Sequence, residues 1–125
     1  MESANKESGK LTTHILDIAN GHPAKGVKIS LHRMNEKRAF FLVGKGETNN
    51  DGRLLKPIIS GENFLVGTYQ LIFHVEEYLN LNLSKSNDEP FLNDIPIQFF
   101  ISRSSEHYHV PLLLSPFGYS TYRGS

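Results

Sequence analysis

The stretch Val27–Arg33, VKISLHR, decides the fold class because apolar and polar residues alternate along it. Val27, Ile29 and Leu31 would share one face of a strand, since successive strand side chains point to opposite faces. The same pattern recurs clearly in two segments and more weakly in two others: 69–75 and 95–102, then 11–18 and 39–43. Repeated alternation of this kind predicts an all-β protein.

Turn-forming residues separate these segments at 20–23, 49–52 and 60–63, and the Asp51-Gly52 pair is a strong turn signal. Only residues 76–83 favour a helix, and their small number limits it to one or two turns. Short strands with turns every roughly 8–12 residues are typical of a β-sandwich or barrel.

Length and composition bound the function classes. The 125 residues predict a single domain at 11–125, preceded by a polar segment, 1–10, that we expect to be a disordered leader. The formal net charge of zero argues against a nucleic-acid partner and a polybasic membrane anchor. The absence of cysteine excludes disulfides, thiolate zinc sites and cysteine nucleophiles. Neither a secretory signal nor an apolar run of roughly 18 residues is present, so we expect a cytoplasmic protein.

The segment His107–Ser115, HYHVPLLLS, departs from simple alternation. One face of this strand would suit the core: Tyr108, Val110, Leu112 and Leu114. The other face mixes histidine with apolar residues: His107, His109, Pro111 and Leu113. Such a face is explained by burial against another subunit, although a monomer with a few exposed apolar residues would also fit. Because Pro111 lacks an N–H donor, we expect the strand to lie at an edge or to bulge there.

The chemistry-bearing residues leave several readings open. His107 and His109 form a His-x-His pair that could supply two zinc ligands, or serve acid–base chemistry, or simply be hydrogen-bonded. A Gly-x-Ser-x-Gly elbow and a Gly-rich phosphate loop are both absent. By composition, residues 115–125 would be a frayed polar tail. The residues alone therefore predict an oligomeric β-sandwich with a His/Arg/Ser site.

Two segments resemble signatures of the transthyretin-like family. Thr13–Asp17, followed by Gly21–Ala24, resembles its opening signature, and residues 107–125, HYHVPLLLSPFGYSTYRGS, resemble its closing one. The terminal Tyr-Arg-Gly-Ser resembles the C-terminal sequence of the family's enzyme branch, whose members hydrolyse 5-hydroxyisourate. It does not resemble the end of the family's hormone carrier. The resemblance covers Leu11 to the end and implies a sandwich of seven or eight strands with one short helix, about 76–83. It also implies a homotetramer with its sites at the dimer–dimer interface.

The resemblance further implies roles for individual residues. Catalytic roles would fall on four residues: His14, His109, Arg53 and Ser125. Substrate binding would involve five: His14, Arg53, Tyr122, Arg123 and His107. No metal or other cofactor is expected, and the expected partners are the small substrate and further copies of the chain, with neither nucleic acid nor membrane.

The implied reaction opens a ring acyl–nitrogen bond in 5-hydroxyisourate and gives 2-oxo-4-hydroxy-4-carboxy-5-ureidoimidazoline in urate breakdown. Water needs a general base near neutral pKa, which suits histidine. We expect one of His14 and His109 to activate water and the other to protonate the leaving nitrogen, with Arg53 holding developing negative charge. Ser125 has no evident activating partner, so an orienting role is favoured over a nucleophilic one. A small-ligand carrier and a purely structural sandwich are the two alternatives.

Overall fold

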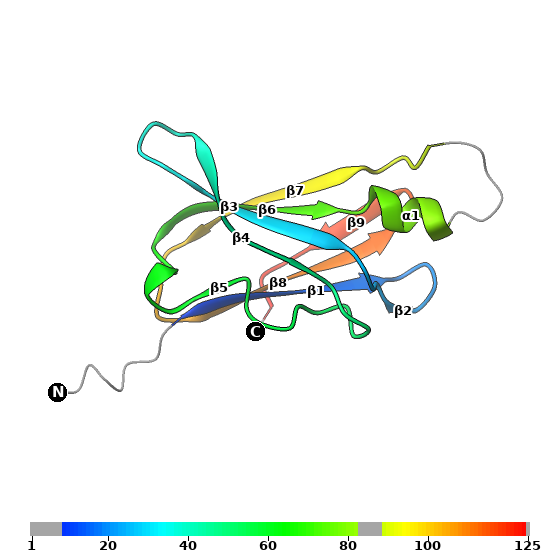
Figure 1. Ribbon diagram of the computed structural model, residues 1–125, viewed down its shortest axis with the longest axis horizontal. Helices are drawn as coiled ribbons and strands as arrows, with labels where there is room; N and C mark the ends of the chain where they lie inside the picture. The colour runs from blue at the N-terminus through cyan, green and yellow to red at the C-terminus, as the bar shows by residue number, and fades with distance from the viewer. Residues whose placement is uncertain (1–8, 83–88, 125) are drawn as a thin grey trace.

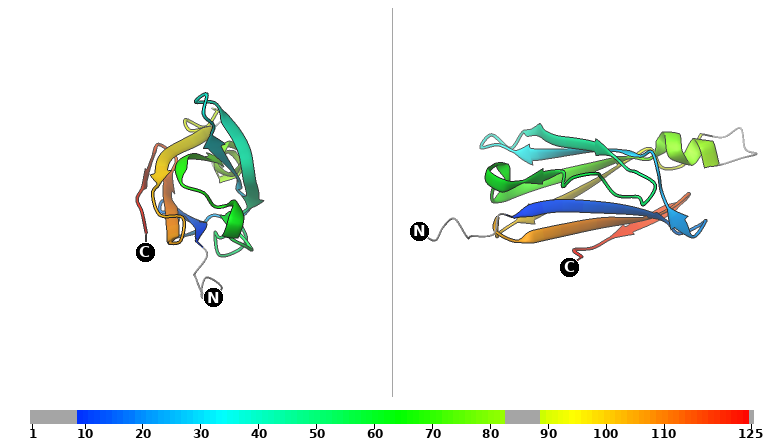
Figure 2. Two further views of the ribbon diagram at one scale, coloured as in Figure 1. Left: turned by 90° about the vertical axis from the view of Figure 1, so that its left-hand side faces the viewer. Right: turned by 60° about the horizontal axis from the view of Figure 1, so that its bottom comes forward.

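The computed structural model describes residues 9–82 and 89–124, which fold as two mainly antiparallel β-sheets packed face to face (Figure 1). Within these residues there are nine strands and one α-helix, and two of the strands, β2 and β5, are only two residues long. Figure 2 shows the two sheets as separate layers with the helix at one end. The predicted all-β sandwich with one short helix is confirmed.

The first sheet has the order β2-β1-β8-β9, with β5 pairing beside β1. Its strands run over these bounds: β1 Lys10–Asp17, β2 His22–Pro23, β5 Ile59–Ser60, β8 His107–Ser115 and β9 Gly118–Thr121. The centre of the sheet is the parallel pair β1 and β8, in which Lys10 lies opposite His107 and His14 opposite Pro111. This pairing brings together chain segments almost a hundred residues apart, and it positions the candidate site.

The second sheet has the order β4-β3-β6-β7 and is antiparallel throughout. Its strands run over these bounds: β3 Lys28–Met34, β4 Phe40–Glu47, β6 Gly67–His74 and β7 Asp94–Ile101. The alternation that predicted β3 is explained by burial, since Ile29 and Leu31 are fully buried in the core while Lys28 is exposed. The core lies between the inward faces of the two sheets, where aromatic and branched apolar side chains remove the largest apolar area from water.

The helix α1, Glu76–Asn82, follows β6 and covers one end of the sandwich (Figure 1). Its buried Tyr78 donates a hydrogen bond of 2.6 Å to Oδ2 of Asp17, which is 4% exposed at the end of β1. Asn20 adds two more hydrogen bonds to the same carboxylate. Burial alone would raise the pKa of Asp17, but these hydrogen bonds outweigh it and hold the pKa below its ordinary value.

The chain end differs from the sequence expectation. Residues 118–121 form β9, which pairs with β8 instead of fraying. The expectation that β8 lies at an edge is therefore wrong, because β8 lies between β1 and β9. Pro111 has no N–H to donate, and it lies just beyond the last β8–β9 pair, which is Leu112 with Thr121. The two segments pair again at an isolated bridge between His109 and Gly124.

The first strand extends slightly beyond the predicted start of the domain. β1 begins at Lys10, which pairs with Ser60 and His107, so the ordered strand starts one residue before the predicted boundary. Residues 1–8 of the predicted leader lie outside the described residues, as does residue 83 at the predicted end of the helix. In the described part of the chain, none of the helices has the length and apolarity needed to cross a membrane.

Candidate active site

The candidate site is a groove of about 610 Å³ on the outer face of the first sheet. Its floor is the β1–β8 pair, and its walls are the segment 53–57 and the chain end at Tyr122 and Gly124. Alternation along β1 points Thr12, His14 and Leu16 outward into this groove. The buried residues between them include Thr13, whose hydroxyl donates to the carbonyl of Val110 at 2.7 Å. The groove therefore follows directly from the pleat of the two central strands.

Two imidazoles on β8 share one hydroxyl on β1. Thr12 Oγ1 lies 2.7 Å from Nε2 of His107 and 2.7 Å from Nδ1 of His109. The ring centroids of His107 and His109 are 6.3 Å apart. The short spacing arises because Thr12 and His109 are direct partners in the parallel ladder. Both imidazoles are thus oriented by a polar contact on the neighbouring strand.

His14 is brought to the same groove from β1. Its ring centroid is 6.4 Å from that of His109, with the planes tilted by 42°. Both imidazoles line the groove, so two groups that can accept or donate a proton lie side by side within it.

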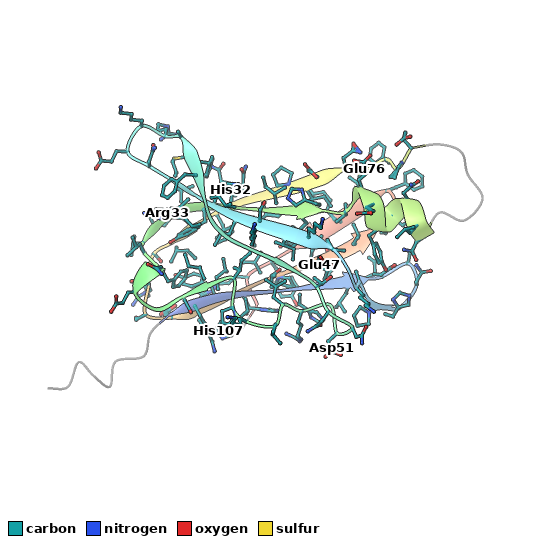
Figure 3. The ribbon with its side chains drawn as sticks, viewed as in Figure 1. His32, Arg33, Glu47, Asp51, Glu76 and His107 are labelled. Carbon is teal, nitrogen blue, oxygen red and sulfur yellow. The ribbon has the colours of Figure 1, made fainter. Side chains whose placement is uncertain are left out.

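Arg53 reaches the groove through a tight turn. The Asn49 side chain accepts hydrogen bonds from the backbone of Asp51 and Arg53, and Gly52 adopts a φ of 74°. The Gly52 carbonyl accepts a hydrogen bond from the Ile15 amide at 2.9 Å, and a Cβ at position 52 would lie only 2.4 Å from the Ile15 carbonyl oxygen. Glycine is required there because the loop lies directly against β1, and this contact places Arg53 opposite His14 in an isolated antiparallel bridge. Figure 3 labels Asp51 in this turn and His107, both along the side of the molecule that β1 occupies.

The electrostatics of the groove favour the neutral forms of His14 and His109. Burial and the nearby Arg53 guanidinium lower the pKa of His14, and a backbone hydrogen bond with Asp51 offsets part of this effect. Burial, Arg53 and the other two histidines of the groove lower the pKa of His109. A histidine whose pKa is lowered in this way is mainly unprotonated at neutral pH and can accept a proton.

The chain end is held against β8 by specific contacts. The Gly124 amide donates to the His109 carbonyl at 2.6 Å, and a Cβ at position 124 would lie only 2.8 Å from Cδ2 of His109. The Arg123 guanidinium lies over the Tyr108 ring at 3.8 Å from its centroid and donates to Glu106 at 3.1 Å. Tyr122 and Gly124 therefore line the groove, while the Arg123 side chain contacts Tyr108 and Glu106 outside it.

The groove is positively charged. Lys10, Arg53 and Lys56 line it together with the three histidines, and among the described residues that line it none is acidic. Such a lining suits a carbonyl-rich or anionic molecule. Across residues 9–82 and 89–124, no three His, Cys, Asp or Glu side chains are grouped so as to hold a metal ion.

The structure brings together five of the predicted site residues: His14, Arg53, His107, His109 and Tyr122. Arg123 is not among the groove-lining residues, and its role in substrate binding stays a prediction. Ser125 lies outside the described residues. The sequence analysis did not single out Thr12, although its position two residues before His14 places both on one strand face. The two basic side chains Lys10 and Lys56 were also missed, because their proximity depends on the loop at 53–57.

The chain is similar in sequence to a known protein family and to curated proteins. The family model "HIUase/Transthyretin family" matches residues 11–124. A 5-hydroxyisourate hydrolase 2 of Rhizobium meliloti (strain 1021) is 50% identical over 119 residues, covering 95% of this chain and 98% of its own.

Two solved structures share the fold. The crystal structure of an (S)-allantoin synthase matches with a TM-score of 0.87 and 44% identity over 96% of this chain, which spans only 45% of that longer protein. Transthyretin from Sparus aurata matches with a TM-score of 0.82 but only 26% identity, over 92% of this chain and 96% of its own. With a family model matched over almost its whole length and a relative half identical to it, the chain belongs to the HIUase/Transthyretin family.

Proposed function

We propose that this protein hydrolyses 5-hydroxyisourate to 2-oxo-4-hydroxy-4-carboxy-5-ureidoimidazoline, a step of urate breakdown. The observation that carries the proposal is the convergence of His14 and His109, 6.4 Å apart between ring centroids, beside Arg53 in a positively charged groove. The name of the Rhizobium meliloti relative supports the substrate. The substrate is a small bicyclic molecule rich in carbonyl groups, and it is small enough to enter the 610 Å³ groove.

The proposed mechanism is general acid–base hydrolysis. One imidazole accepts a proton from water as the water attacks the ring carbonyl, and a second proton transfer releases the ring nitrogen. Burial and the Arg53 charge lower the pKa of both His14 and His109, which keeps a basic nitrogen available at neutral pH. The planar guanidinium of Arg53 offers paired donors to the substrate carbonyl oxygens and stabilises the negative charge that develops on the attacked group.

The remaining predicted residues take supporting roles in this proposal. Tyr122 forms part of the groove wall and shapes the substrate pocket. Ser125, the last residue, orients the substrate or water, and Arg123 holds the chain end through Tyr108 and Glu106. We keep the cytoplasmic location as a prediction.

The proposal includes a homotetramer in which the groove faces a second dimer. The outer face of the first sheet carries the part-buried Leu16 and the exposed Tyr122 around the groove, and Tyr122 is 59% exposed in the single chain. A second copy of the same face would cover these apolar groups and exclude bulk water from the histidines. Sedimentation or light scattering that gives a monomer under assay conditions would contradict this part.

A coupled assay tests the activity. Urate oxidase generates 5-hydroxyisourate in the cuvette, and its ultraviolet decay is followed with and without this protein. We expect rapid added decay that His109→Ala reduces by about 10²- to 10⁴-fold, the usual contribution of a positioned acid or base. Decay at the spontaneous rate with the wild-type protein would overturn the hydrolase, and retention of an aromatic ligand without turnover would instead support the carrier. Turnover that survives exhaustive chelation is expected, and its loss would point to a bound metal.

A further inference from the structure

The contact between Thr12 and the two β8 histidines limits which ring nitrogens can carry hydrogen. Thr12 Oγ1 is 2.7 Å from Nε2 of His107 and from Nδ1 of His109. A threonine hydroxyl has only one hydrogen, so it can donate to only one of these nitrogens. At least one of the two nitrogens must therefore carry a hydrogen and donate it to Thr12. Where the hydroxyl accepts from one imidazole and donates to the other, the protonation states of the two imidazoles are linked through it.

Three arrangements satisfy this constraint when both rings are neutral. In one of them both nitrogens donate to the hydroxyl oxygen, and in the other two the hydroxyl connects the imidazoles by accepting from one and donating to the other. In the first of these two, Nδ1–H of His109 donates to Thr12, and the Thr12 hydroxyl donates to Nε2 of His107. In the second, both hydrogen bonds run in the opposite direction, and Nε2 of His109 then carries the hydrogen. These two arrangements assign His109 opposite roles, because of the two Nε2 can accept a proton only in the first and donate one only in the second.

The surroundings of the His109 ring show which atom is available for catalysis. Its Nδ1 edge is occupied by Thr12, and its Cδ2 edge lies against Gly124, where a Cβ would be 2.8 Å away. Nε2 is therefore the nitrogen left for a reacting molecule. A base at Nε2 requires the hydrogen on Nδ1, which excludes the second arrangement. Of those that remain, only the first connects His109 to His107 through the hydroxyl.

We propose that Thr12 is a positioning residue that fixes the Nδ1–H form of His109 and links it to His107 as a proton relay. This inference rests on the proposed hydrolase function. As Nε2 of His109 takes a proton from water, the Nδ1 hydrogen moves to Thr12 Oγ1 and the hydroxyl hydrogen moves to Nε2 of His107. His109 stays neutral, now with Nε2–H, and the positive charge appears on His107.

The relay also completes the reaction without a further proton source. His109 Nε2–H donates its proton to the leaving nitrogen, and the shift through Thr12 reverses, which returns Nδ1–H to His109 and neutral His107. The proton taken from water thus ends on the released nitrogen. The arrangement places the transient charge on the exposed imidazole of His107 instead of the part-buried His109, where desolvation disfavours it.

The charged groups around the relay are compatible with this direction of transfer. His109 faces the Arg53 guanidinium and His14, which both disfavour a second positive charge there. His107 lies opposite Lys10 in the ladder and follows Glu106 in the chain, and that carboxylate contacts Arg123. Asp51 is the carboxylate that acts on His14, while Glu106, which also contacts Arg103, is the carboxylate beside His107 in the chain.

The test compares Thr12→Val, which removes the hydroxyl but keeps the β-branched shape, with Thr12→Ser, which keeps the hydroxyl. Thr68→Val on β6 of the other sheet is the matched control for the substitution itself. Nitrogen-15 spectra of the ligand-free protein report which ring nitrogen of His109 carries hydrogen, and the coupled assay gives kcat over a range of pH. Circular dichroism and the thermal midpoint establish that each variant is folded.

We expect wild type and Thr12→Ser to show Nδ1–H on His109, with kcat values within about threefold of each other. Thr12→Val should lose the Nδ1–H form and about 10- to 100-fold in kcat, with an altered pH profile and little change in KM. An Nε2–H form in the wild type, or a folded Thr12→Val with wild-type kcat and the Nδ1–H form, would overturn the inference. The spectra need no substrate, so a wild-type protein without turnover would refute the hydrolase and leave the tautomer result to stand separately.

Discussion

Replacing Gly124 by alanine tests whether the chain end positions the catalytic histidine. A Cβ at position 124 would lie 2.8 Å from Cδ2 of His109, and ordinary contact begins at 3.4 Å, so the atoms must separate by 3.4 − 2.8 = 0.6 Å. Gly124 does not have a positive φ, so alanine introduces no backbone strain there. Nδ1 lies on the opposite side of the His109 ring from Cδ2, so a shift of the ring away from position 124 moves it towards Thr12 and compresses the 2.7 Å hydrogen bond. Because a misplacement of about 1 Å costs up to 10²-fold in rate, we expect Gly124→Ala to lower kcat about 10-fold, or about 1.4 kcal/mol in activation free energy.

The control for this variant is Gly118→Ala at the start of β9, where the nearest atom to an added Cβ is Ser115 Oγ at 3.9 Å. We expect Gly118→Ala to keep the wild-type kcat in the coupled 5-hydroxyisourate assay. Thermal midpoints of the two variants establish that each is folded at the assay temperature. Equal kcat for Gly124→Ala and Gly118→Ala would refute the argument that the Gly124–His109 contact sets the catalytic geometry.

Four further predictions concern charge, pH and stability. Arg53→Glu should lower kcat/KM by at least about 10²-fold, since it removes the donors for the developing charge, and an unchanged kcat/KM would remove Arg53 from the site. Because burial and the Arg53 charge lower the pKa values of His14 and His109, kcat/KM should fall at acidic pH with a midpoint below 6.5, and a midpoint above 6.5 would contradict this. The unfolded chain binds more protons than the folded one below pH 6.5, so these two groups should also make the free energy of unfolding decrease as pH falls through that range. Tyr78→Phe should lower the free energy of unfolding in urea by about 1.5–3 kcal/mol with kcat unchanged, because the buried Asp17 carboxylate loses one of its donors, and an unchanged unfolding midpoint would refute that role.

Local pattern predicted most of the fold. Alternation at 27–33 and 69–75 marked β3 and β6 because every second side chain there is apolar and buried. It was weaker in β1 because two of the inward positions, Thr13 and Asp17, are polar. Their hydrogen bonds to Val110 and Tyr78 compensate the burial, and those partners are distant in the sequence. Strand β9 was missed for a similar reason, since its polar residues gain their order from pairing with β8.

The sequence by itself determined that the protein is an all-β domain and, through resemblance, that His14, Arg53 and His109 are candidates for catalysis. Side-chain identity and alternation are local properties, so they can be read along the chain. Only the tertiary structure decided that Thr12 lies between His107 and His109, because the parallel pairing of β1 and β8 joins segments 95 and 97 residues apart. The same holds for the lowered pKa values of the groove histidines, which depend on burial and on charges contributed by a separate loop. Parallel strands need a long connection, so the contacts that set this chemistry are inevitably distant in sequence.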